Sequence, residues 1–190
     1  MNVLELFISS ILNNNIALVF ILGMCPLIAI STSVKNAKGM GIAVVFVVTI
    51  TAVINYPIYQ LLLATNTEFI SLIVFIITIA AVVQLLEIFL EKFSPRLYNA
   101  FGIFLPLITV NCVVLAVSLF FVNRDYTFVE TVSFSFGSGV GWMIAIILVA
   151  GLREKLAKIS NPPKGLRGKA IVFIILGILA LAFMGFTGLV

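Results

Sequence analysis

The chain has 190 residues, of which 63% are hydrophobic and 9% are charged, with a formal net charge of +4. Soluble domains carry roughly 25% charged residues, so this composition excludes an ordinary soluble protein and indicates a domain embedded in a lipid bilayer. Histidine is absent, and the sequence contains no Walker loop, dinucleotide fingerprint or catalytic triad. A soluble-type enzyme site and metal sites built on imidazole are therefore not expected in this chain.

Six apolar stretches approach or exceed the length of about 20 residues that a helix needs to cross a bilayer. They are Leu4–Ile30, Met40–Ala64, Ile70–Leu90, Ala100–Val122, Val129–Leu152 and Ala170–Val190. We therefore expect an all-α integral membrane protein with six transmembrane helices in one domain, residues 1–190. The start of the chain lacks a basic segment with a following cleavage site, so no cleaved signal peptide is expected.

Polar and helix-breaking residues interrupt the first and fourth stretches. They are Asn13, Asn14, Asn15, Gly23 and Pro26 in the first, and Gly102, Pro106 and Asn111 in the fourth. Proline removes a backbone donor and clashes with the preceding turn, and in lipid each freed backbone group needs a protein partner or a cavity. We expect helices 1 and 4 to be interrupted, although kinked packing helices would also contain such residues.

The two halves of the chain contain similar phrases in the same order. The matching segments are Cys25–Ser31 with Cys112–Ser118, Gly39–Val48 with Gly139–Leu148, and Ile73–Ile77 with Ile171–Ile175. Each half holds three helices, an odd number, so the second copy would enter the membrane from the opposite side. We expect residues 1–95 and 96–190 to be inverted repeats that bring Cys25 and Cys112, the only cysteines, together near mid-bilayer.

Basic residues are distributed unevenly between the expected loops. Ten of the eleven follow odd-numbered stretches: Lys35, Lys38, Lys92, Arg96, Arg153, Lys155, Lys158, Lys164, Arg167 and Lys169. Only Arg124 follows an even-numbered one. The positive-inside rule then places the odd loops in the cytoplasm and both termini outside. A basic patch for nucleic acid would not explain this alternation. We therefore expect the chain to interact with a lipid bilayer and not with nucleic acid.

The two cysteines allow three interpretations. Cysteine often fills space as a small apolar residue, a disulfide would link the two halves rigidly, and thiolates bind copper(I), zinc or iron–sulfur clusters. A [2Fe–2S] cluster commonly takes four thiolates, so a second chain would have to complete any such cluster here. Glu87 is the one acid well inside an apolar run, and it is either part of an ion pathway or an interfacial group near Lys92.

Several segments together resemble the membrane-subunit family that sodium-translocating NADH:quinone oxidoreductase shares with the Rnf ferredoxin:NAD oxidoreductase. They are LGMCP, YNAFGIFLPLITVNC, RDYTFVE, FGSGVGWMIAI, LREKL and LRGKAIVFI with LAFMGFTGL, and they cover nearly the whole chain. The segments RDYTF and GSGVGWM favour the quinone-reductase branch. Pro26 departs from that branch, because proline after this cysteine is more typical of Rnf A subunits.

The resemblance implies a bacterial inner-membrane protein within a complex of six subunits. It implies a homologous partner of opposite orientation, the D subunit, and a [2Fe–2S] cluster shared with it, for which Cys25 and Cys112 match the ligand positions. Flavins and NADH would bind other subunits while electrons cross the membrane and sodium is exported. The alternative from another class is a small secondary transporter, which also uses inverted repeats and broken helices. A transporter of charged solutes usually carries midplane acids or bases, and stretches 1 and 4 offer none there.

Overall fold

All regular structure in the described residues of the computed structural model is helical, and the described residues are 3–65, 68–93, 106–159 and 169–185. The elements are α1 (Val3–Ile11), α2 (Met24–Ile30), α3 (Val34–Ala64), η1 (Glu68–Ile70), α4 (Ser71–Phe93), α6 (Pro106–Thr109), α7 (Cys112–Asn123), α8 (Phe128–Ile159) and α9 (Lys169–Met184). The all-helical prediction is therefore confirmed for this part of the chain.

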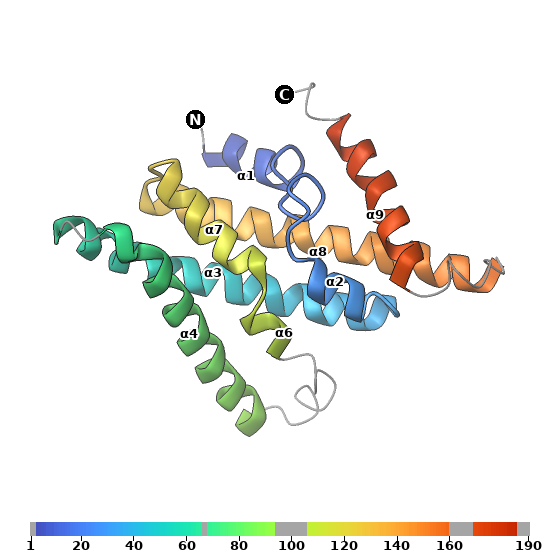
Figure 1. The fold of residues 1–190 in the computed structure, drawn as a ribbon, viewed down its shortest axis with the longest axis horizontal. Helices are drawn as coiled ribbons and strands as arrows, with labels where there is room; N and C mark the ends of the chain where they lie inside the picture. Colours follow the sequence, from blue (N-terminus) through green and yellow to red (C-terminus); the bar gives the residue numbers. More distant parts are fainter. Residues whose placement is uncertain (1–2, 66–67, 94–105, 160–168, 186–190) are drawn as a thin grey trace.

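The two longest helices, α3 and α8, lie side by side and run in opposite directions (Figure 1). Glycines make their close approach possible. A Cβ atom on Gly139 would lie 3.0 Å from the Val45 backbone, and one on Gly41 would collide with the Met143 side chain. Small residues at such contacts let helix backbones approach closely, so the glycine pattern that both helices contain has a packing role.

Helix α1 packs on the first half of α8 through two further glycines. A Cβ atom on Gly137 would collide with Ser10 Oγ and lie 3.1 Å from the Phe7 carbonyl oxygen. A Cβ atom on Gly141 would lie 3.3 Å from the Ile11 carbonyl oxygen. The glycine-rich run at residues 137–141 is therefore a helix-packing surface.

Three helices of the described chain are long and apolar enough to cross a bilayer: Val34–Ala64, Ser71–Phe89 and Phe128–Lys158. Two shorter apolar segments are also helical: Ala170–Met184, and Leu107–Asn123 with a break at residues 110–111. Large apolar side chains on the outer surface of these helices are exposed, among them Ile42, Ile77 and Leu181. This surface suits a lipid environment, and the expected count of six spanning helices stays a prediction.

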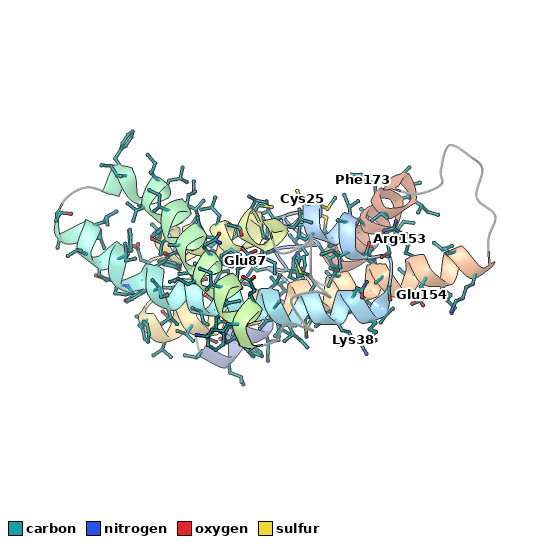
Figure 2. The ribbon with its side chains drawn as sticks, turned by 90° about the horizontal axis from the view of Figure 1, so that it is seen from below. Cys25, Lys38, Glu87, Arg153, Glu154 and Phe173 are labelled. Carbon is teal, nitrogen blue, oxygen red and sulfur yellow. The ribbon has the colours of Figure 1, made fainter. Side chains whose placement is uncertain are left out.

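Two helices extend beyond the apolar stretches that predicted them. Helix α3 begins at Val34 after Ser33, which has extended backbone at φ −143°, and α8 continues to Ile159. Several basic residues expected in loops therefore lie on helical turns, where Lys, Arg and Glu are good helix formers. The start of α3 and the end of α8 lie at the same end of the molecule, where Figure 2 labels Lys38 and Glu154.

Some predicted features fall outside the described residues. These are Gly102, residues 100–105 of the expected fourth helix, the last five residues of the expected sixth helix, and the basic residues Arg96, Lys164 and Arg167.

Candidate functional site at two helix interruptions

The first expected helix is interrupted between Ile11, the last residue of α1, and Met24, the first residue of α2. Asn15 organises the intervening segment from a fully buried position. Its Nδ2 donates to the carbonyl oxygens of Ile11 at 3.0 Å and Gly141 at 3.1 Å, and its Oδ1 accepts from the backbone N–H groups of Ala17 and Leu18. One asparagine thus satisfies backbone groups that the missing helix leaves free.

The backbone just before Cys25 is twisted into the left-handed region. Gly23 has φ +78° and Ile21 has φ +55°. Glycine adopts this conformation without steric cost, whereas a β-branched residue such as isoleucine rarely does. Strained backbone of this kind clusters at functional sites, where the surrounding structure holds it.

The second interruption lies directly before Cys112. Helix α6 ends at Thr109 and α7 begins at Cys112. Asn111 caps α7, because its Oδ1 accepts the backbone N–H of Val113 at 3.1 Å. Cys112 is therefore the first residue of a twelve-residue helix, a position where the helix dipole favours negative charge.

The two interruptions meet at a sulfur atom. The backbone N–H of Gly23 donates to Cys112 Sγ over 2.9 Å, which places the segment before Cys25 against the other cysteine. Both cysteines are free thiols; Cys25 is exposed and Cys112 is half-buried. The prediction of interrupted helices at both cysteines is confirmed, no disulfide forms between them, and their role as metal ligands stays a prediction.

Two buried N–H donors near Cys112 have no acceptor among the described residues: Asn111 Nδ2 and Trp142 Nε1. Trp142, on α8, is fully buried, and a Cβ atom on Gly23 would collide with its Nε1. Sequence reasoning did not identify Trp142 as a functional residue. The available signal was that the chain contains a single tryptophan, directly after the glycine-rich run.

Arg153 anchors the helix that carries Cys25. Its Nη1 donates to the Ile28 carbonyl oxygen and to Ser31 Oγ, both over 3.2 Å. Cations stabilise the C-terminal end of a helix, where carbonyl groups lack intrahelical partners. Arg153 was expected only as a topological marker, and this contact adds a structural role. Figure 2 labels Cys25, which lies on α2, and Arg153, which lies on the neighbouring α8.

Glu87 is half-buried on α4, which Figure 2 shows as a separate helix from the one that carries Cys25. Within the described residues it forms no ion pair with Lys92, since the one ion pair found there joins Lys158 to Glu154 at 4.0 Å. The role of Glu87 in an ion pathway stays a prediction.

Within the described residues, no three His, Cys, Asp or Glu side chains gather as a set of metal ligands. Cys25 and Cys112 are the two thiolate ligands that the chain offers. This pair suits half of the four-thiolate set that a [2Fe–2S] cluster commonly uses. A cluster at this place would need ligands from a second chain.

A family model and two relatives with the same name match this chain over nearly its full length. A family model described as a membrane protein, the Rnf-Nqr subunit, matches residues 3–190. The E subunit of the Na(+)-translocating NADH-quinone reductase of Maridesulfovibrio salexigens is 48% identical, covering 99% of this chain and 98% of its own. The protein of the same name from Hahella chejuensis is 48% identical, covering 98% of this chain and 97% of its own.

Proposed function

Because the chain belongs to the Rnf-Nqr family of membrane subunits, we propose that it is a membrane subunit of a sodium-translocating NADH:quinone oxidoreductase. Two relatives bearing that enzyme's name support the quinone-reductase branch over nearly the whole chain. An Rnf complex is the alternative, and the Pro26 departure is the feature that favours it. The remaining subunits of the complex would bind NADH and the flavins.

In this proposal the chain crosses the inner membrane six times as two inverted three-helix repeats, with both termini outside. Support comes from the antiparallel pairing of α3 and α8 through glycines of the same repeated phrase. Further support comes from the helix interruptions, which precede the cysteine in both halves. Inverted repeats related by an axis in the membrane plane place equivalent features at their mutual interface.

Cys25 and Cys112 would hold a [2Fe–2S] cluster jointly with two thiolates of a homologous protein, the D subunit, in the opposite orientation. The single observation that carries this proposal is the hydrogen bond from Gly23 N–H to Cys112 Sγ. It joins the two cysteine segments, and it is the kind of contact that tunes sulfur ligands. The exposure of Cys25 leaves that thiol accessible to a partner. When bound, such a cluster would supply one-electron transfer within the membrane.

A secondary transporter remains the alternative from a different class, because broken helices in inverted repeats also build solute sites. The residues at the two interruptions argue against it. They provide thiols, asparagine side chains and backbone, and no charged side chain, whereas charged solutes usually require intramembrane acids or bases.

The test is iron and acid-labile sulfide analysis of the purified complex, with EPR of the reduced protein. We expect Cys25→Ala and Cys112→Ala each to abolish the intramembrane cluster signal and electron flow to quinone. Val110→Ala is the control, because Val110 lies two residues from Cys112 but is 70% exposed, and this variant should retain the signal. An unchanged iron signal in either cysteine variant would exclude that thiol as a ligand.

A further inference from the structure

We propose that the indole N–H of Trp142 donates a hydrogen bond to a sulfur atom of the centre that Cys112 helps to hold, and that it thereby raises the reduction potential of this centre. Trp142 acts in this scheme as a positioning residue, with no direct bond to metal. The inference rests on the proposed function and assigns a role to Trp142, which is not one of the proposed ligands.

The first observation is the unsatisfied donor itself. Trp142 is fully buried, and its Nε1 has no acceptor among the described residues. Leaving a buried donor unpaired is costly, so such groups in native proteins require an explanation. The other unpaired atoms include rotatable hydroxyls of Thr51, Thr131 and Ser138. An indole N–H is a donor only, in a direction set by the ring.

The second observation is the location of the donor. Both Trp142 and Cys112 lie against Gly23. Trp142 Nε1 lies where a Cβ atom on Gly23 would collide with it, and Cys112 Sγ accepts the Gly23 N–H. Trp142 therefore lies at the junction of the two cysteine segments. The neighbouring residue on α8, Gly141, accepts the hydrogen bond from Asn15 at 3.1 Å. Two consecutive residues of α8 therefore contact the same non-helical segment, at Asn15 and at Gly23.

The third consideration is the chemistry of the missing acceptor. Thiolate and inorganic sulfide accept N–H hydrogen bonds, and such bonds favour the more negatively charged, reduced state of an iron–sulfur centre. A chain that contains half of the ligand set would be expected to have an unsatisfied donor beside it. Trp142 Nε1, an unpaired donor at the junction of the two cysteine segments, is such a group.

The test is a redox titration of the intact complex followed by EPR, comparing wild type with Trp142→Phe. Phenylalanine keeps an aromatic ring and removes the N–H. We expect the cluster signal to persist. The one-electron equilibrium should shift about tenfold toward the oxidised state, so that the midpoint reduction potential becomes about 59 mV more negative. Phe134→Leu is the control, because it alters another buried aromatic residue of α8 that carries no N–H, and its potential should match wild type.

A second measurement detects the indole nitrogen beside the cluster directly. The complex is labelled with tryptophan that carries ¹⁵N in the indole ring, and pulsed EPR of the reduced wild type records the nuclear couplings. Because Trp142 is the only tryptophan of this chain, we expect a ¹⁵N coupling that Trp142→Phe eliminates.

Absence of that coupling, or an unchanged or raised potential in Trp142→Phe, would overturn the inference while leaving the proposed function intact. A wild-type complex without any intramembrane iron signal would instead overturn the proposed function, and the inference with it.

Discussion

Gly23 meets three structural demands at one position. Its backbone is left-handed at φ +78°, the space where a Cβ atom would lie is taken by Trp142 and Val113, and its N–H donates to Cys112 Sγ. Only glycine satisfies the first two demands together, because it lacks the Cβ atom that causes both conflicts. The conformation of this one residue therefore determines how the two cysteine segments meet.

We expect Gly23→Ala to weaken the site. An L-residue in left-handed conformation costs about 1–2 kcal/mol, and the added methyl group would push Trp142 or Val113 away. Iron content per complex and the midpoint temperature of thermal unfolding should both fall.

Gly177→Ala on α9 is the matched control, because a Cβ atom there meets nothing within 4 Å. Alanine favours a helix by about 1 kcal/mol over glycine, so this variant should be as stable as wild type or more so. Equal iron content and stability in both variants would show that the Gly23 conformation is dispensable.

At the level of the helices, α3 and α8 form a packed pair against which the two interrupted segments lie. Its core is fully buried and includes Val44, Val47, Trp142 and Ile146. The non-helical segment of residues 12–23 is attached to this pair through Asn15 and Gly141, and α2 is attached through Arg153. A displacement of α8 would therefore reach the Cys25 segment on both sides of that residue and, through the Gly23 hydrogen bond, Cys112.

We expect Gly139→Ala to separate α8 from α3. The added Cβ atom would lie 3.0 Å from Val45 Cα, which is backbone and cannot rotate away, and overpacking of this kind costs typically about 1–3 kcal/mol. The measurement is the midpoint temperature of the purified complex together with its cluster content.

Gly151→Ala is the control on the same helix, because its Cβ atom would meet nothing within 4 Å. It should leave both quantities at or above the wild-type level. Full stability of Gly139→Ala would mean that the two helices can separate without consequence for the site.

For the whole molecule, the two ends of the α3–α8 pair differ in the charged residues that they carry. Lys35 and Lys38 lie at the start of α3, and Lys158 lies at the end of α8. The opposite end carries Arg124 and Asp125 between α7 and α8, and Glu130, which accepts hydrogen bonds from the Thr127 backbone and hydroxyl and so caps α8. The positive-inside rule assigns the lysine-rich end to the cytoplasm.

We expect a cysteine introduced at Lys158 to face the cytoplasm and one introduced at Asp125 to face outward. Both positions are exposed, and the chain would carry Cys25→Ser and Cys112→Ser so that the new thiol alone reacts. Intact cells treated with a membrane-impermeant thiol reagent should label position 125 only. Permeabilised cells should label both positions, and labelling of 158 alone in intact cells would reverse the topology.

Local chemistry in the sequence was enough to predict membrane insertion, helical structure and the interruptions before Cys25 and Cys112. Apolar length determines which segments enter a bilayer, and residues such as Asn15, Gly23 and Asn111 act on their immediate neighbours, so their effects can be read from adjacent positions. The helix ends were less accurate, because charged residues such as Lys35 and Arg153 continue a helix beyond its apolar stretch. The number of spans, the repeat and the metal ligands stay predictions.

Only the tertiary structure decided which groups meet. The N–H of Gly23 contacts a sulfur 89 residues away, and Asn15 contacts a carbonyl 126 residues away. No local pattern encodes such pairs, because they depend on how α8 packs against two other segments at once. The same holds for Trp142, whose burial beside Gly23 arises from packing and whose unpaired N–H becomes visible only when every neighbouring acceptor has been located.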